Sequence, residues 1–432
     1  MTRHVVDGKS KAVFSGVTIL HVNHLLEDVL TLNEILRELG ATIIYVPVMY
    51  GSVREPPKDL AYQVIAEARP PDRNASMRDV VTARLELAIG LIGKEWSSTL
   101  VLEDGGRHYS VMLDRVGRGA TVSAPIAAVE QTRRGAGLAS AFLADRRSAG
   151  LRYPIVTIAR SMLKIRFENV FVATRIIEEL SLALGALGDF LPYRRVVVVG
   201  YGILGRAIAK GLRTYRCDVV VVEKDPHVRS VAAKEGFLVC DVVRASHAAN
   251  TTVVIGATGS DCFALDELNA LRRGGCTIAY LVSASSGTVE FARLQESATG
   301  RVTFPRPTDG DIWRRLGIRD VSTGSNLQAL LVAEGFPINF FRPDSESLAP
   351  RVIDPINAEM LVAAQWLLSR PTGVTPRVYK FGWENDELPI GPDAEMAILR
   401  SWLHLNHMSS SPDELNRYFD RHPAENQLLQ AP

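Results

Sequence analysis

Cysteine is scarce in this sequence, whose 432 residues include only four. No two of them have the C-x-x-C spacing, which argues against a zinc ribbon. All four lie within a stretch of sixty residues, a clustering that does not suit the disulfide framework of a small secreted domain. A reducing compartment fits this composition best. The four cysteines are Cys217, Cys240, Cys262 and Cys276.

Long apolar runs and an excess of charge of one sign are also missing. No run approaches the ~18 apolar residues of a transmembrane helix, and the N-terminal segment MTRHVVDGKSKAVF lacks the apolar core of a signal peptide. The 49 basic and 48 acidic residues leave a net charge of +1, which argues against a protein that binds nucleic acid or a membrane surface. We therefore expect a soluble, cytoplasmic protein whose partner is a small molecule.

Lysine is rare too, because nine of the 49 basic residues are lysines and the others are arginines. A lysine at a motif position therefore carries more weight here than in an average chain. Apolar residues make up 47% of the sequence and charged residues 22%, so the chain can bury sizeable cores. Its length predicts two or three domains.

Strands alternate with helices along the first part of the chain. Residues 17–47 are predicted to form a strand, a helix and a second strand. Apolar residues recur at helical spacing over 25–39, Gly40 ends the helix, and residues 42–46 are rich in β-branched side chains. This alternation predicts an α/β fold with mostly parallel sheets. The further candidates are strands at 99–102 and 154–158 and a long helix at 167–184.

A second alternating unit begins at Arg194 and continues to about Ile338. We therefore place the domain boundaries at 1–187, 188–338 and 339–432. The last segment is predicted to hold a long helix at 351–369, an extended stretch at 377–381 and a terminal helix opened by the capping box Ser411-Pro-Asp-Glu414.

The strongest single motif is Gly200-Tyr-Gly202-Ile203-Leu204-Gly205, which follows the apolar run 196–199 and opens an amphipathic helix. This is G-x-G-x-x-G in the context that a dinucleotide-binding turn requires. Gly200 permits the tight turn, Gly202 lets the backbone approach a pyrophosphate, and Gly205 lets the helix pack closely on the strand. We therefore expect a Rossmann domain.

The next predicted strand, 218–222, ends at Glu223, eighteen residues after Gly205. A carboxylate at this position can bind the ribose diol of the adenosine and repels a 2′-phosphate, so NAD is favoured over NADP. FAD is disfavoured because its fingerprint usually lies near the start of a chain. The turn Ala257-Thr258, after a strand at 252–255, is a second expected contact of the cofactor.

Five segments in order resemble the S-adenosylhomocysteine hydrolase (adenosylhomocysteinase) family. The likeness covers roughly residues 14–370 and is divergent. Each match alone is unspecific, but five in the family's order are hard to dismiss. The matches, each followed by the corresponding family motif in parentheses, are Asn23-His24 with Gly40-Ala41 after it (LHMT), Leu102-Glu-Asp-Gly-Gly106 (LDDGG), Lys164-Ile-Arg-Phe-Glu-Asn169 (KSKFDN), Val198–Gly205 (AGYGDVG) and Val222-Glu-Lys-Asp-Pro226 (TEIDP).

The resemblance implies a central Rossmann NAD domain inserted between the segments of an α/β substrate-binding domain. In that family the bound NAD oxidises the 3′-hydroxyl of a nucleoside, the ketone acidifies the 4′ C–H, and the 5′ thiol is expelled. Water then adds, and the stored hydride returns, so the cofactor is not released. Family members are commonly tetramers, so we expect a homo-oligomer, a dimer or tetramer.

The resemblance also implies roles for individual residues. Lys164 matches the lysine that helps to deprotonate the 3′-hydroxyl, while His24 and Asp104 match the residues that handle the 4′ proton and the 5′ leaving group. Four further positions correspond to ribose or cofactor contacts of the family, and Glu168 replaces a family aspartate. These positions are Glu130 for the ribose hydroxyls, Asn169 near the lysine and the nicotinamide, Asn339 for the carboxamide, and Thr132, the one threonine kept where the family has a triplet that touches NAD and this sequence has Gln131-Thr132-Arg133.

Other readings of these residues remain open. Lys164 and Glu168 can meet on one face of a helix as a base and its partner, or as a surface ion pair. Asp104 stands where turn-forming aspartates are common, Glu130 alone would be unremarkable on a solvated face, and Asn339 can simply cap a turn. His21 and His24 lack a third ligand, so we expect no metal.

The departures from the family are as informative. The NIGH segment is replaced by 281–286 and the GHP segment by 341–346, both without histidine. The KPDHYRY tail has no convincing counterpart. The residues that correspond to the family's NAD-dependent oxidation therefore match, while those that correspond to its homocysteine and purine contacts differ.

We expect a NAD enzyme that oxidises a nucleoside and eliminates water or thiol across the 4′–5′ bond, with a nucleoside dehydratase favoured. The alternatives are an S-adenosylhomocysteine hydrolase proper, a non-catalytic NAD-binding regulatory paralogue, and a generic dehydrogenase that releases NADH.

Overall fold

The computed structural model describes Thr2 and residues 8–48, 57–66, 77–285, 289–297, 316–322, 326–341, 346–369, 374–382 and 392–408. These residues form two α/β units. The first contains the described residues up to Glu168 and from Ala349 onwards, and the second those from Asn169 to Leu348. The sequence placed the boundaries at 187/188 and 338/339. They lie elsewhere in the structure because helix α6 (Asn169–Ala186) packs on helix α7 (Ile203–Thr214) of the second unit.

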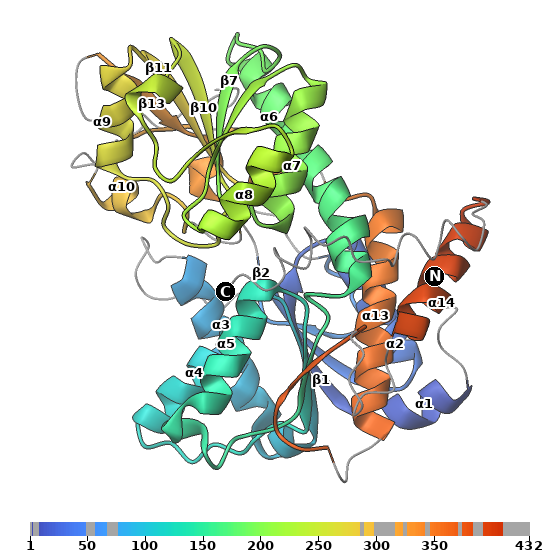
Figure 1. Ribbon diagram of the computed structural model, residues 1–432. Helices are drawn as coiled ribbons and strands as arrows, with labels where there is room; N and C mark the ends of the chain where they lie inside the picture. Colours follow the sequence, from blue (N-terminus) through green and yellow to red (C-terminus); the bar gives the residue numbers. More distant parts are fainter. Residues whose placement is uncertain are drawn as a thin grey trace. The chain divides into compact units, whose positions relative to one another are not determined.

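The first unit is built on a seven-stranded parallel sheet (Figure 1). After β1, the chain adds β2 and β3 on one side of that strand. It then crosses to the other side of β1 and adds β4, β5, β6 and β14 there. The ends of β1 and β4 therefore flank the point where the strand order reverses. In spatial order the strands are β3 (Gln63–Val64), β2 (Thr42–Val48), β1 (Thr18–His24), β4 (Thr99–Glu103), β5 (Ala127–Glu130), β6 (Ile155–Thr157) and β14 (Val378–Lys380).

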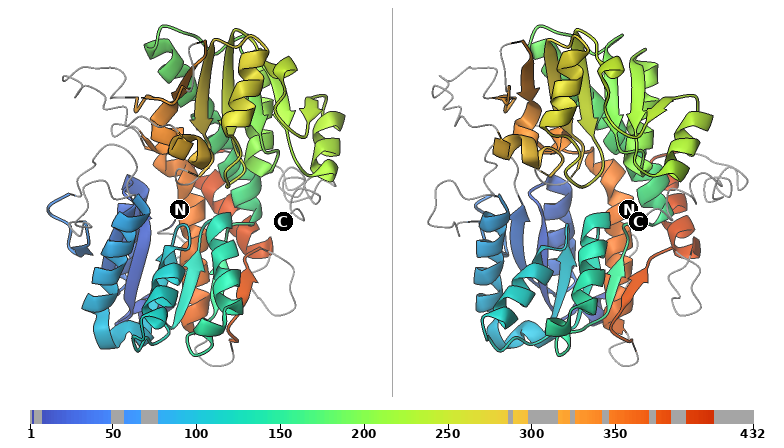
Figure 2. Two further views of the ribbon diagram at one scale, coloured as in Figure 1. Left: turned by 90° about the vertical axis from the view of Figure 1, so that its left-hand side faces the viewer. Right: turned by 60° about the vertical axis from the view of Figure 1, so that its left-hand side comes forward.

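Helices cover both faces of this sheet (Figures 1 and 2). All seven residues of β1 and all of β4 and β5 are buried, as expected for parallel strands between two helical layers. One layer contains α1 (Gly8–Phe14), α2 (Glu27–Glu38), α13 (Pro350–Ser369) and α14 (Pro392–Leu405), and the other α3 (Met77–Ile92), α4 (Arg107–Gly117) and α5 (Arg133–Ala144).

The second unit has the same winding around a second seven-stranded sheet. Its first six strands in space are parallel and follow the 3-2-1-4-5-6 order of a Rossmann fold, and β12 pairs antiparallel with β13 at the edge. The order reverses between β7 and β10. In spatial order the strands are β9 (Leu238–Cys240), β8 (Asp218–Val222), β7 (Arg195–Val199), β10 (Thr251–Gly256), β11 (Ile278–Ser283), β13 (Gln328–Leu331) and β12 (Arg319–Asp320).

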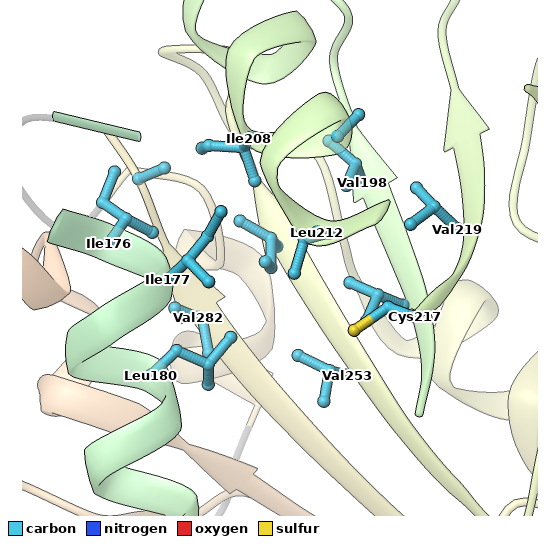
Figure 3. Close-up of a cluster of buried hydrophobic side chains, with 14 of the residues drawn as sticks. Ile176, Ile177, Leu180, Val198, Ile208, Leu212, Cys217, Val219, Val253 and Val282 are labelled. Atoms are coloured by element: carbon cyan, nitrogen blue, oxygen red, sulfur yellow. The ribbon is translucent and has the colours of Figure 1, made fainter. Parts of the chain in front are cut away.

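Alternate residues of β7 face two separate apolar cores. Val196 and Val198 pack with α6, α7 and α8 (Pro226–Lys234). Val197 and Val199 pack with α9 (Leu265–Arg273) and α10 (Ala292–Ser297) on the opposite face. Figure 3 shows the first of these cores, where side chains of α6 and α7 meet those of β7 and β10. The unit therefore has three layers, helix–sheet–helix.

The secondary structure predicted from the sequence is confirmed where the structure describes it. The predicted strand–helix–strand at 17–47 is β1, α2 and β2, the strands at 99–102 and 154–158 are β4 and β6, and the return helix is α13. The long helix begins earlier than predicted, with a π-helical turn at Leu163–Glu168 before α6. The capping box at 411–414 lies outside the described residues. Among the described helices, none is long and apolar enough to span a bilayer.

Replacement of Leu212 by alanine should destabilise the second unit. Its side chain is fully buried in the core shown in Figure 3, so the variant loses apolar burial and leaves a cavity. We expect the free energy of unfolding to fall by about 2–5 kcal/mol, measured by urea denaturation. Leu182→Ala on α6, where the side chain is 53% exposed, is the matched control. A similar loss in both variants would contradict this account of the core.

Candidate active site

His24 and Asp104 lie at the point of the first sheet where the strand order reverses. His24 is the last residue of β1, and Asp104 follows β4. Their Nε2 and Oδ1 atoms are 3.8 Å apart, and both side chains are at most a tenth exposed. Burial lowers the pKa of His24, although the Asp104 carboxylate opposes the shift. The site therefore holds a neutral imidazole next to a carboxylate, an arrangement that can accept a proton.

Polar neighbours fix the backbone of His24. The Asn23 side chain accepts a hydrogen bond from the His24 amide at 2.7 Å, and the Tyr45 hydroxyl donates to the His24 carbonyl at 2.7 Å. Asn23 also donates to Gln131 after β5, at 3.2 Å, which links the ends of two strands. These bonds stabilise the end of β1.

Glu130, at the end of β5, is fully buried, so its reading as a solvated surface residue was wrong. Its Oε1 accepts hydrogen bonds from the Gly105 amide at 3.2 Å and from the amide and hydroxyl of Thr132 at 2.7 Å each. A Cβ at Gly135 would lie 2.0 Å from the carboxyl carbon, so that glycine makes room for it. Burial, followed by the charge of Glu103, raises the pKa of Glu130 well above its usual range.

The other carboxylate oxygen of Glu130 is buried and, among the described residues, accepts no hydrogen bond. A buried polar atom without a partner is costly, and native proteins keep few of them. An unsatisfied oxygen at the carboxyl edge of a parallel sheet is suited to receive a ligand hydroxyl.

Lys164 and Glu168 meet as their spacing predicts. The Lys164 Nζ lies 2.5 Å from Glu168 Oε2, and the two side chains are 12% and 10% exposed. The turn that carries them is π-helical, a geometry that is frequent at functional sites. A shielded amine and carboxylate at this distance can exchange a proton.

Two buried acids from the C-terminal helices hold the segment before Lys164. The Ser161 hydroxyl donates to Glu359 of α13 at 2.8 Å and accepts the Lys164 amide at 3.1 Å, while Glu395 of α14 accepts the Met162 amide at 3.0 Å. Burial, then the neighbouring Glu395, raises the pKa of Glu359. Sequence reasoning missed both acids, because the contacts join residues about two hundred positions apart.

A further buried chain of polar groups supports Asp104. The Glu103 carboxylate lies 2.5 Å from His108 Nδ1, and His108 Nε2 lies 2.7 Å from the Tyr153 hydroxyl. Glu103 also accepts the Arg107 amide at 3.0 Å. These contacts tie the end of β4 to the start of α4, so that the turn carrying Asp104 is fixed at both sides.

In the second unit, the glycines form the backbone cradle that a dinucleotide needs. Gly200 has φ +94°, and a Cβ there would lie 2.8 Å from the Ala257 carbonyl oxygen. A Cβ at Gly205 would lie 2.0 Å from the Gly200 carbonyl oxygen. Among the described residues, no side chain caps the N-terminus of α7 at Gly202, which leaves its amides for an anion. These residues fit a pyrophosphate.

Glu223 follows β8 beside this turn. Its carboxylate accepts hydrogen bonds from the Tyr201 amide at 2.8 Å and the Asp225 amide at 2.9 Å. It therefore fixes the glycine-rich turn and leaves further lone pairs for a ribose diol. Beyond β10, the Thr258 hydroxyl donates to buried Glu290 at 2.7 Å, which holds the second turn in place.

The predicted site residues separate into two groups by unit. Thr132, predicted as a cofactor contact, caps α5 and bonds to Glu130 within the first unit. Asn169 is the first residue of α6, and Asn339 is buried and donates to the Ser347 hydroxyl at 3.1 Å. Among the described residues, no cluster of three metal-ligating side chains is present. The first group is His24, Asp104, Glu130, Thr132, Lys164 and Glu168, and the second Asn169, Gly200, Gly202, Ile203, Leu204, Gly205, Glu223, Ala257, Thr258 and Asn339.

Gly205→Ala should abolish tight binding of NAD. The added methyl would collide with the Gly200 carbonyl and push α7 away from the turn. We expect a loss of roughly 100-fold in NAD affinity, measured by isothermal titration calorimetry. Gly137→Ala on α5, where the new methyl meets no atom within 4 Å, is the matched control. Unchanged affinity in Gly205→Ala would contradict the site.

Glu130→Gln should stabilise the protein at neutral pH. The folded protein holds the Glu130 proton more tightly than the unfolded chain, so stability falls as the pH rises through the raised pKa. The glutamine has no charge to bury, so we expect a gain of about 1–2 kcal/mol that grows from pH 5 to 8. Thermal unfolding at several pH values measures it, with Glu34→Gln at the half-exposed Glu34–Arg37 pair as control. A variant less stable than wild type would refute the explanation.

Comparison with known protein families agrees with the geometry of the second unit. The family model described as "S-adenosyl-L-homocysteine hydrolase, NAD binding domain" matches residues 186–305. Among solved structures, the dipicolinate synthase A chain from Bacillus subtilis is similar, with a TM-score of 0.41, 12% identity and coverage of 82% of this chain and 98% of that one.

Curated relatives extend the match beyond this domain. The adenosylhomocysteinase of Thermococcus kodakarensis is 28% identical over 246 residues, which is 55% of this chain and 52% of the relative. The S-inosyl-L-homocysteine hydrolase of Methanothermobacter thermautotrophicus is 26% identical over 293 residues, 67% of this chain and 62% of the relative. The alignments thus span about half to three fifths of these relatives. Residues 186–305 therefore carry the NAD-binding domain of the S-adenosyl-L-homocysteine hydrolases, and the chain resembles a divergent member of the adenosylhomocysteinase superfamily.

Proposed function

We propose that this protein uses bound NAD to oxidise the 3′-hydroxyl of a nucleoside, eliminates the 5′ substituent and then reduces the sugar again. The observation that carries the proposal is the set of buried acid–base groups at the carboxyl edge of the first sheet. In this set, Lys164 contacts the Glu168 carboxylate, and the neutral imidazole of His24 lies beside Asp104. Redox-neutral elimination needs two proton-transfer sites of this kind.

The Lys164–Glu168 pair accepts the proton of the 3′-hydroxyl. NAD, when bound, supplies the hydride acceptor and returns the hydride at the end of the cycle. Removal of the hydride requires that the hydroxyl proton go to a base. The 2.5 Å contact lets the proton pass between amine and carboxylate, so the pair acts as one proton acceptor shielded from water.

His24 and Asp104 transfer the proton of the 4′ carbon. Oxidation makes the 4′ C–H acidic, and the neutral imidazole of His24 is in the right form to take that proton. The Asp104 carboxylate, 3.8 Å from Nε2, stabilises the imidazolium that results. The same proton then protonates the group that leaves from the 5′ carbon.

Glu130 orients the sugar. Its unpaired oxygen forms a hydrogen bond with a ribose hydroxyl, as the donor when the carboxyl is protonated and as the acceptor when it is ionised, which would satisfy an atom that is otherwise buried without a partner. Its other oxygen is already committed to Gly105 and Thr132. The carboxyl therefore presents a single site to the substrate.

We favour loss of water over loss of thiol from the 5′ carbon. The chain has no histidine in 281–286 or 341–346, where the family has its NIGH and GHP segments. Of the second of these, residues 342–345 lie outside the described part. Without those contacts for homocysteine and purine, the 5′ group is smaller or differently recognised. Loss of water followed by re-reduction would give a 4′,5′-unsaturated sugar.

The same missing histidines favour two other candidates. One is hydrolysis of an S-nucleosyl homocysteine with another base, since one relative is an S-inosyl-L-homocysteine hydrolase. The other is a regulatory NAD-binding protein without catalysis. The product mass separates the first from dehydration, and the absence of any proton exchange identifies the second.

Proton exchange at the 4′ carbon tests the proposal. The protein is incubated with NAD and a panel of nucleosides, including S-adenosylhomocysteine, in D₂O, and deuterium is read by mass spectrometry. We expect exchange at this carbon in wild type and a fall of about 10²–10⁴-fold in its rate in Lys164→Ala. Lys94→Ala, an exposed lysine before β4 at the opposite end of the strand, should retain the wild-type rate.

Two results would overturn the proposal. One is full exchange in Lys164→Ala, which would remove the lysine from the reaction. The other is absence of exchange with every nucleoside while NAD is demonstrably bound. A lasting rise in absorbance at 340 nm during turnover would instead indicate a dehydrogenase that releases NADH.

A further inference from the structure

Cys240 differs from the other three cysteines. Burial raises the pKa of the Cys217 thiol to about 11, and it raises the pKa values of Cys262 and Cys276 as well. A thiol held protonated reacts slowly, because the thiolate is the nucleophile. Cys240 ends β9, is half-buried, and has its sulfur 3.1 Å from His247 Nε2.

The hydrogen bonds of His247 fix its tautomer. The Arg244 backbone amide donates to Nδ1 at 3.1 Å, so this nitrogen carries a lone pair and no proton. Burial, followed by the charges of Arg244 and Arg195, lowers the pKa of His247, so the ring is neutral at pH 7. Its single proton is therefore on Nε2 and points at the sulfur. This N–H donates to the Cys240 sulfur.

Cys240 also adjoins the adenosine end of the cofactor site. It pairs with Val222 in the sheet register, and its carbonyl oxygen accepts the Glu223 amide at 2.9 Å. Glu223 is the carboxylate that the Rossmann fold places at the adenosine ribose. A change in the Cys240 side chain therefore occurs one strand away from the residue that binds the ribose.

We propose that the Cys240–His247 pair is a peroxide-sensitive site that controls the affinity of the protein for NAD. The Cys240 sulfur attacks one oxygen of a hydroperoxide, the O–O bond breaks, and two electrons pass from sulfur to the peroxide. The products are a sulfenic acid on Cys240 and water, or an alcohol from an organic hydroperoxide. The added oxygen enlarges the side chain beside Glu223 and weakens NAD binding.

Chemical reactivity tests the first part. The full-length protein is treated with hydrogen peroxide and dimedone, or with iodoacetamide alone, and the modified fraction of each cysteine is measured by peptide mass spectrometry. We expect Cys240 to react about tenfold faster than Cys217, Cys262 or Cys276. His247→Asn should slow it several-fold, because the asparagine keeps an acceptor for the Arg244 amide and loses the contact with sulfur.

Should His247→Asn fail to fold, the comparison among the four cysteines of the wild type still decides the matter. Equal labelling of the four, or Cys240 among the slowest, would overturn the proposal. Saturating NAD should protect Cys240 and leave the labelling of Cys217 unchanged. Labelling of Cys240 that NAD does not slow would also contradict its place beside the cofactor.

Titration calorimetry with NAD tests the second part. Peroxide treatment should weaken NAD binding several-fold in wild type, and dithiothreitol should restore it. In Cys240→Ser the affinity should no longer respond to peroxide. Oxidation of Cys240 without a change in NAD affinity would refute the coupling, and a response that persists in Cys240→Ser would assign it to another residue.

Discussion

The reversal of strand order in each parallel sheet is the constraint on which the candidate site depends. In both units the successive strands are added on one side of the first strand and then on the other, so the connections after the two central strands run in opposite directions. His24 and Asp104 follow the central strands of the first sheet, and Gly200 and Ala257 those of the second. Each unit thus places its candidate reactive or cofactor-binding groups at its own switch point, which is where open α/β sheets bind ligands.

Burial of carboxylates is the second feature shared by the site residues. Glu103, Glu130, Glu359 and Glu395 are each fully buried, and each receives at least one hydrogen bond from a backbone amide, a hydroxyl or a histidine. Those bonds offset only part of the cost of desolvation, as the raised pKa values of Glu130 and Glu359 indicate. A first unit that carries so much buried acid is less stable than an apolar equivalent would be, in return for groups whose protonation is set by their surroundings.

Local signals were sufficient for much of this structure, and long-range contacts explain the rest. The glycine-rich turn could be predicted because strand, glycines and helix are contiguous, and the Lys164–Glu168 contact because four residues separate its members. The contacts that bury Glu130 could not be predicted, because the residues around it, such as Gly105 and Gly135, belong to other turns. The support of Ser161 by Glu359 joins residues 198 positions apart, and a single sequence contains no pattern that pairs them.

The unpartnered oxygen of Glu130 and the shielded Lys164–Glu168 pair support the proposed catalysis over a purely regulatory role. A protein that only bound NAD would need the second unit, and its first unit would be more stable with apolar residues in place of Glu130 or of the Lys164–Glu168 pair. Instead the first unit keeps a buried oxygen of Glu130 that has no partner among the described residues. It also keeps the Lys164 amine against the Glu168 carboxylate. Both features lie at the ends of parallel strands or just beyond them. The unpartnered oxygen of Glu130 is costly in a folded protein unless a ligand completes it. The departures from the family lie in other segments, so under the proposed function they change what is recognised and leave the candidate proton-transfer groups in place. A changed substrate therefore accounts for the chain better than a lost reaction does.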